Sequence, residues 1–162
     1  SIIDAAYAMG KVKTGALMVI ERNTSLKEIE RTGIEINGLV TSQLLINIFE
    51  HNTPLHDGAV VIRGNRVAAA TCYLPLSDNM TISKDLGTRH RAAVGVSEVT
   101  DSLTIVVSEE TGRVSVAEGG ALTRIADAES LRKILAQVEK PAEESGRFKL
   151  WKGRLKNERK AD

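Results

Sequence analysis

Aromatic residues, cysteine and proline are all scarce in this chain of 162 residues. Only 3% of the residues are aromatic, so the core has to be aliphatic, and a stacking platform for single-stranded nucleic acid is disfavoured. The one cysteine, Cys72, has no partner for an internal disulfide, which indicates a reducing compartment. No apolar run reaches the length of a membrane span.

A dominant charge of one sign is missing as well, because the formal net charge is +1 at pH 7. No field of the whole protein therefore attracts DNA or a membrane surface. What is present is an ordinary globular composition, 42% hydrophobic and 27% charged, which excludes a disordered chain and a disulfide scaffold. The length suits a single domain with its own core.

Basic residues gather at the C-terminal end, where residues 147–162 hold seven basic and two acidic side chains. We expect residues 1–140 to form one domain and residues 141–162 to form a basic, disordered tail. The spacing of Phe148, Trp151 and Leu155 leaves open a short amphipathic segment that lies on an anionic membrane. Because the chain begins with Ser1, we also expect a fragment of a longer protein.

Hydrophobic periodicity and turn residues outline the secondary structure. Seven strands are predicted, over residues 15–21, 34–40, 58–63, 66–74, 103–108, 113–118 and 121–125. Five helices are predicted, over residues 2–12, 25–32, 42–53, 88–100 and 127–140. Strands and helices do not alternate strictly, which argues against a Rossmann or barrel layout. We therefore predict an α/β fold with a mixed central β-sheet of about seven strands, flanked on both faces by about five helices.

Two arginines and a histidine open the predicted helix at residues 88–100. If Thr88 is its N-cap, Arg89, His90 and Arg91 occupy the first turn, where the helix dipole disfavours cations. A bound anion would remove this conflict, because free amides, a hydroxyl and guanidinium groups all suit phosphate oxygens. The alternative is a solvated helix start whose arginines pair with nearby carboxylates.

Polar residues also lie beside three predicted strands. His56 and Asp57 precede one of them, where Asp57 suits the orientation of a hydroxyl or the binding of Mg²⁺, although an Asp-Gly pair is commonly a plain turn. Tyr73 suits stacking on a base, although a half-buried tyrosine packed on the sheet is the commoner case. Glu109 and Glu110 suit a metal ion or a solvated turn. No P-loop, dinucleotide-binding glycine motif, Cys/His metal spacing or serine-hydrolase elbow is present.

Four motifs, in their order along the chain, resemble the diadenylate cyclase domain, or DAC domain. They are HDGA at residues 56–59, CYLPLS at 72–77, LGTRHRAA at 86–93 and VSEETG at 107–112. The resemblance covers residues 7–140 and is to the membrane-anchored class of Gram-positive bacteria. It implies condensation of two ATP into cyclic di-AMP with release of two pyrophosphates, using Mg²⁺ or Mn²⁺.

The resemblance also implies roles for individual residues. Asp57, backed by Gly58, would lie near the ribose 3′-hydroxyl and the α-phosphate. The implied catalytic residues are Asp57, Gly58, Thr88, Arg89, His90 and Arg91. The implied ATP-binding residues are Gly58, Ala59, Tyr73, Leu74, Thr88, Arg89, His90, Arg91, Ser108 and Glu109. The implied metal-binding residues are His56, Asp57 and Glu110.

One site binds one ATP whereas the product needs two, so two copies of the domain must face each other across a two-fold axis. By the resemblance, the full-length protein is held at the cytoplasmic face of the cell membrane by a segment missing here, and this fragment is soluble. A nucleotide-binding regulatory module that no longer cyclises is the alternative, which the intact motifs disfavour. A nucleic-acid-binding domain is disfavoured by the low net charge and the few aromatic residues.

Overall fold

The computed structural model describes residues 1–139 of the chain. Residues 1–131 form one compact unit, and a second unit begins at Arg132. Of this second unit the described part is residues 132–139, which belong to the helix α5 (Ala128–Glu139). The predicted tail, residues 141–162, lies outside the described residues.

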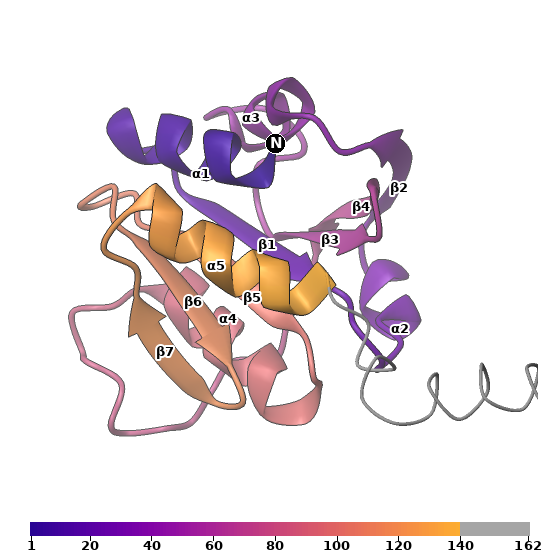
Figure 1. Ribbon diagram of the computed structural model, residues 1–162. Coiled ribbons are helices and arrows are strands. Elements are labelled where there is room, and N and C mark those ends of the chain that lie inside the picture. The colour runs from indigo at the N-terminus through magenta and orange to yellow at the C-terminus, as the bar shows by residue number, and fades with distance from the viewer. Residues whose placement is uncertain (140–162) are drawn as a thin grey trace, which may run out of the picture. The chain divides into compact units, whose positions relative to one another are not determined.

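The described residues contain the seven strands and five helices that the sequence predicts (Figure 1). The strands are β1 (Ala16–Ile20), β2 (Ile34–Leu39), β3 (Ala59–Arg63), β4 (Arg66–Cys72), β5 (Leu103–Val107), β6 (Val114–Glu118) and β7 (Ala121–Arg124). Besides α5, the helices are α1 (Ile2–Lys11), α2 (Lys27–Glu30), α3 (Ser42–Phe49) and α4 (Thr88–Val99). Within residues 1–139, no helix combines the length and the apolar character that crossing a membrane requires.

All seven strands form one mixed sheet in the order β2-β4-β3-β1-β5-β6-β7. β1 is parallel to β3, and each of the other neighbouring pairs is antiparallel. The predicted fold class is thereby confirmed. This topology brings the first residues of β1 and β3 and the last residues of β4 and β5 together at one end of the central strands.

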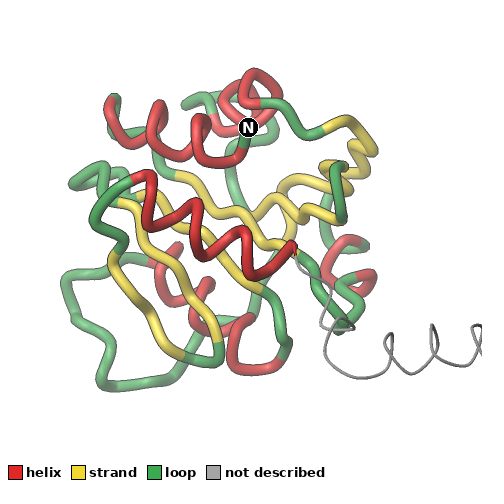
Figure 2. The backbone as a smooth tube through the Cα atoms, in the orientation of Figure 1, coloured by secondary structure: helices red, strands yellow, loops and turns green. Residues whose placement is uncertain are grey.

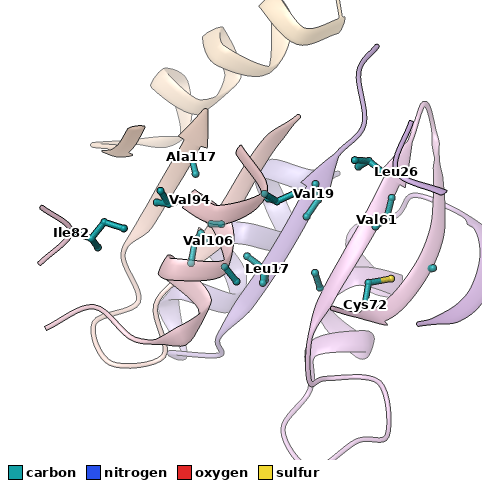
Figure 3. Close-up of a cluster of buried hydrophobic side chains, with 14 residues drawn as sticks. Leu17, Val19, Leu26, Val61, Cys72, Ile82, Val94, Val106 and Ala117 are labelled. Atoms are coloured by element: carbon teal, nitrogen blue, oxygen red, sulfur yellow. The ribbon is translucent and has the colours of Figure 1, made fainter. Parts of the chain in front are cut away.

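Helices cover both faces of the central strands, since β1 and β5 are buried at every residue. On one face Leu17, Val19 and Val106 belong to a core cluster that also includes Val94 of α4 (Figure 3). In Figure 1, α4 lies behind the sheet, whereas α1, which contacts β5 and β6, lies above β1 in this view. α4 therefore packs against the central strands β1 and β5 and against their neighbour β6.

The first residues of the long loop between β4 and α4, residues 73–87, pack against α4 (Figure 2). The Ser77 amide donates to the carbonyl oxygen of Arg91 at 3.0 Å. At Gly95, a Cβ atom would lie 2.7 Å from the carbonyl carbon of Pro75 and 2.9 Å from the Ser77 nitrogen. Glycine is a poor helix former, so close approach of the loop explains its presence within α4.

We expect Gly95→Ala to destabilise the fold by about 1–3 kcal/mol, because the added methyl group would push the loop backbone off α4. The better helix propensity of alanine alone would stabilise the fold by about 1 kcal/mol, so the sign of the change is diagnostic. Val99→Ala, at a position of α4 that is 69% exposed, is the control and should change the free energy of unfolding by no more than about 0.5 kcal/mol. Urea unfolding measures both variants. Unchanged or increased stability of Gly95→Ala would contradict the close packing.

Candidate active site

A cleft of about 1620 Å³ opens at the end of the central strands where β1 and β3 begin and β4 and β5 end. The loop at residues 73–87 and the first turn of α4 also line it. Ligand pockets in proteins typically measure about 300–1,000 Å³, so a nucleoside triphosphate fits within this space.

Most of the residues that the sequence singles out line this cleft. They are His56, Asp57, Gly58, Tyr73, Leu74, Thr88, Arg89, His90, Ser108, Glu109 and Glu110. Two others are not among the lining residues: Ala59 is fully buried in β3, and Arg91 is partly buried on α4. Because side chains two residues apart lie on different sides of a helix, Arg91 does not share the direction of Arg89.

Gly58 sets the position of the exposed Asp57 at the mouth of β3. Its φ is 89°, a left-handed conformation that glycine adopts readily. A Cβ atom at Gly58 would lie 2.9 Å from the Cys72 carbonyl oxygen and 2.9 Å from the Thr71 carbonyl carbon. The β4 backbone therefore requires glycine here, which is a reason that the sequence alone does not reveal.

Backbone strain is present beside this glycine. Thr71, near the end of β4, has a φ of 56°, which is unusual for a β-branched residue. The register between β3 and β4 shifts in the same region, between Ala59 and Val61. Strain of this kind costs about 1–3 kcal/mol for each residue and concentrates at functional sites. Thr71 itself lines the cleft, so the strained residue belongs to the site.

Two histidines meet on the wall of the cleft. Nδ1 of His56 donates to the carbonyl oxygen of Thr53 at 2.7 Å, because a carbonyl oxygen can only accept. In the neutral ring this bond leaves Nε2 of His56 with its lone pair. The ring of His51, which no motif singles out, lies edge-on to that of His56 with the centroids 5.7 Å apart.

The N-terminus of α4 suits the binding of an anion. Its N-cap is Gly87 and not Thr88, which is the first helical residue. Among the described residues, no side chain caps this end and no acidic residue lies in its first turn. The amides of the first turn and the positive end of the helix dipole therefore remain available for an anion.

Arg89 is paired with a carboxylate of the neighbouring turn. Its Nη1 lies 3.4 Å from Oε2 of Glu109, and the two side chains are 24% and 57% exposed. The predicted alternative, an arginine paired with a nearby carboxylate, therefore holds for Arg89. Exposed pairs contribute only about 0.2–1 kcal/mol, so a phosphate can replace this carboxylate at little cost.

His90 is buried at the start of α4, with 6% of its surface exposed. Burial, and to a smaller extent the positive charge of Arg89, lower the pKa of His90 below its ordinary value of 6.5. The imidazole is therefore neutral at pH 7. The unfolded chain takes up this proton more readily, so the stability that neutral His90 contributes is complete above pH 6.5 and decreases as the pH falls below that value.

We expect Arg89→Gln to raise the pKa of His90 while leaving it below 6.5, because burial is the larger of the two causes. NMR titration of the ring protons measures this pKa in the wild type and in the variant. A wild-type pKa at or above 6.5, or a pKa that does not rise in Arg89→Gln, would contradict the assignment.

The turn after β5 is held by Ser108. Its Oγ accepts from the amides of Glu110 and Thr111, each at 3.2 Å, which leaves the hydroxyl hydrogen free to be donated. The Gly112 amide donates to the Ser108 carbonyl oxygen at 2.9 Å and closes the turn. Within residues 1–139, no three His, Cys, Asp or Glu side chains are gathered so that they could hold a metal ion.

Tyr73 stands exposed at the rim of the cleft. Its side chain is 80% exposed, so the alternative of a half-buried tyrosine packed on the sheet is wrong. The Tyr73 amide donates to Oγ1 of Thr32 at 2.8 Å, which fixes the backbone at this point. Leu74 packs against the core cluster and lines the cleft. The rim therefore offers an aromatic ring beside an aliphatic wall, which suits a planar base.

The family comparison matches most of the chain. A family model described as "DAC: DisA bacterial checkpoint controller nucleotide-binding" matches residues 3–122. A protein of Listeria monocytogenes named diadenylate cyclase is 54% identical over 155 residues, 94% of this chain and 57% of that protein. The cyclic di-AMP synthase CdaA of Bacillus subtilis is 54% identical over 156 residues, 95% of this chain and 57% of that protein. The chain thus spans little more than half the length of these relatives.

Solved structures share the fold. The crystal structure of a double mutant of DacA from Staphylococcus aureus is 49% identical, with a TM-score of 0.83 over 85% of this chain and 91% of that one. A structure described as a hypothetical membrane spanning protein from Bacillus cereus is 45% identical, with a TM-score of 0.75 over 78% of this chain and 62% of that one.

Proposed function

Since the chain belongs to the DAC family, we propose that it is the catalytic part of a diadenylate cyclase, which joins two ATP into cyclic di-AMP and releases two pyrophosphates. The observation that supports this most is the single cleft that Asp57, the first turn of α4 and Tyr73 share. A carboxylate, an anion-binding helix start and an exposed aromatic ring are what a nucleoside triphosphate and its 3′-hydroxyl require.

In the proposed complex, Tyr73 and Leu74 frame the adenine, and Thr88, Arg89 and the α4 amides bind the triphosphate. Phosphoryl transfer depends mainly on positioning and on the neutralisation of charge. Asp57 orients the 3′-hydroxyl and accepts its proton as the oxygen attacks an α-phosphate, from which pyrophosphate leaves. Two such attacks close the ring of the product.

A divalent ion, Mg²⁺ or Mn²⁺, is part of the proposal. The donor set of the cleft fits an ion that takes some of its ligands from the nucleotide, because Mg²⁺ commonly binds one or two carboxylates together with phosphates. Asp57 and Nε2 of His56 would hold it, with Glu110 on the same cleft. When bound, such an ion neutralises charge on the phosphates.

We propose that the active species is a homodimer in which two clefts face each other, because one cleft presents one set of these residues. Specific activity should then rise with protein concentration wherever the chain is partly monomeric. Activity measured across a concentration series, with sedimentation of the same samples, tests this prediction. Specific activity that stays constant in a sample shown to be monomeric would contradict it.

Residues 1–140 would be the catalytic part of the whole protein. We propose that a segment outside this sequence anchors it, with the catalytic part at the cytoplasmic face of the membrane. The Bacillus cereus structure, described as a membrane spanning protein, supports this. No nucleic acid partner is proposed.

A nucleotide without a 3′-hydroxyl tests the proposed chemistry. With ATP and Mn²⁺, chromatography should reveal cyclic di-AMP as the product. 3′-Deoxy-ATP alone should bind without reacting, and its mixture with ATP should yield a linear dinucleotide, because only one of the two attacks is then possible. ATP that binds without ever being joined would overturn the cyclase proposal and favour a regulatory module.

A further inference from the structure

Gly15, immediately before β1, adjoins the arginine of the cleft. It is buried, and its φ lies outside the left-handed region, so its backbone conformation does not require glycine. A Cβ atom at Gly15 would lie 2.6 Å from Nη1, 2.7 Å from Cζ and 3.1 Å from Nε of Arg89. The guanidinium of Arg89 thus occupies the space that a side chain at position 15 would fill.

The sheet register explains why these residues meet. Ala16 of β1 pairs with Val107 of β5, so Gly15 lies where β1 meets the turn that carries Glu109. Glu109 contacts the same guanidinium at 3.4 Å. Arg89 therefore has the backbone at Gly15 against its guanidinium group and a carboxylate as an ion-pair partner.

We propose that Gly15 is a positioning residue, which leaves the space that Arg89 needs to present its guanidinium to the phosphates of a bound nucleotide. The proposal rests on the proposed function for the role of Arg89. A guanidinium is a rigid, planar fork, so a displacement of about 1 Å would misalign its hydrogen bonds to a phosphate. A methyl group at position 15 would force such a displacement.

The packing around Gly15 predicts that Gly15→Ala changes the affinity for ATP but not the stability of the fold. A new methyl group at position 15 would meet the far end of the flexible Arg89 side chain, which can move aside. At Gly95, by contrast, it would meet backbone atoms. We expect the melting temperature of Gly15→Ala to remain within about 2 °C of that of the wild type. The affinity for ATP should fall by about 10- to 100-fold, as on loss of a hydrogen bond to a charged group.

The test measures the affinities of the full chain for ATP and for AMP by calorimetry. Gly15→Ala should weaken ATP binding and leave AMP binding within about threefold, because AMP lacks the β- and γ-phosphates. In an Arg89→Ala background, adding Gly15→Ala should change the ATP affinity by less than about twofold, because the two residues act through one interaction. In the wild-type background, the NMR resonance of the Arg89 Nε–H group should shift in Gly15→Ala.

A Gly15→Ala protein with unchanged ATP affinity, or a loss that persists in full without Arg89, would overturn the proposal. An equal loss of ATP and AMP affinity with a lower melting temperature would indicate a structural role and would overturn it too. None of these measurements requires product formation. A chain that binds ATP without joining two molecules would therefore contradict the proposed function while these affinities still decide the role of Gly15.

Discussion

Replacing Asp57 by asparagine is expected to lower the rate of cyclic di-AMP formation by about 10²–10⁴-fold, the range in which a positioned general base contributes. An amide keeps the shape of the side chain but has no charge to orient a hydroxyl, accept its proton or attract a metal ion. Asp57 is exposed, so the fold should keep its stability within about 0.5 kcal/mol. ATP binding should remain within about threefold of the wild type, because Asp57 acts mainly on the 3′-hydroxyl.

Measurement of kcat together with the Kd for ATP separates these effects. Asp78→Asn is the matched control, because Asp78 is exposed on the loop at residues 73–87 and is not among the residues that line the cleft. Its activity should equal that of the wild type. Cyclic di-AMP formation by Asp57→Asn at near the wild-type rate would remove Asp57 from its proposed role.

The second large effect is expected from Arg89→Ala, which should weaken ATP binding by about 10- to 100-fold. Stability should change by less than about 1 kcal/mol, because the lost ion pair with Glu109 is partly exposed and the lost charge opposed the helix dipole. Arg91→Ala should weaken ATP binding less, since Arg91 is not among the residues that line the cleft.

Calorimetry with ATP, combined with thermal unfolding, measures both properties of each variant. Arg31→Ala is the control for loss of a positive charge, because Arg31 is exposed and is paired with Glu28 outside the cleft. A large fall in the melting temperature of Arg89→Ala would indicate that Arg89 is structural, and normal ATP affinity would remove it from the binding site.

The local features of this fold follow from the sequence, whereas the contacts between distant segments do not. Apolar runs such as residues 15–21 and 103–108 predict buried strands, and both are found as β1 and β5. The pairing of β1 with β3 on one side and β5 on the other depends on the whole sheet, and no single run encodes it. The helix predicted over residues 88–100 is found as α4, one residue shorter, and it begins after Gly87.

In the candidate site too, local motifs are visible in the sequence, whereas contacts between distant segments are not. The motifs around Asp57 and Arg89 are visible in the sequence because the chemistry needs those residue types. The space at Gly15 that the Arg89 guanidinium fills is not, because Arg89 lies far along the chain from Gly15. The positive φ of Thr71 is not visible in the sequence either. Arg113, just before β6, and Arg124, at the end of β7, also line the cleft, and no local pattern marks them.

The ratio of products formed from ATP tests the central claim most directly. The chain is incubated with ATP and Mn²⁺, and cyclic di-AMP and pyrophosphate are quantified in the same reaction. We expect two pyrophosphates for each cyclic di-AMP, and loss of both products in Asp57→Asn. Release of ADP and phosphate, or ATP recovered unchanged at a protein concentration where the chain is dimeric, would contradict it.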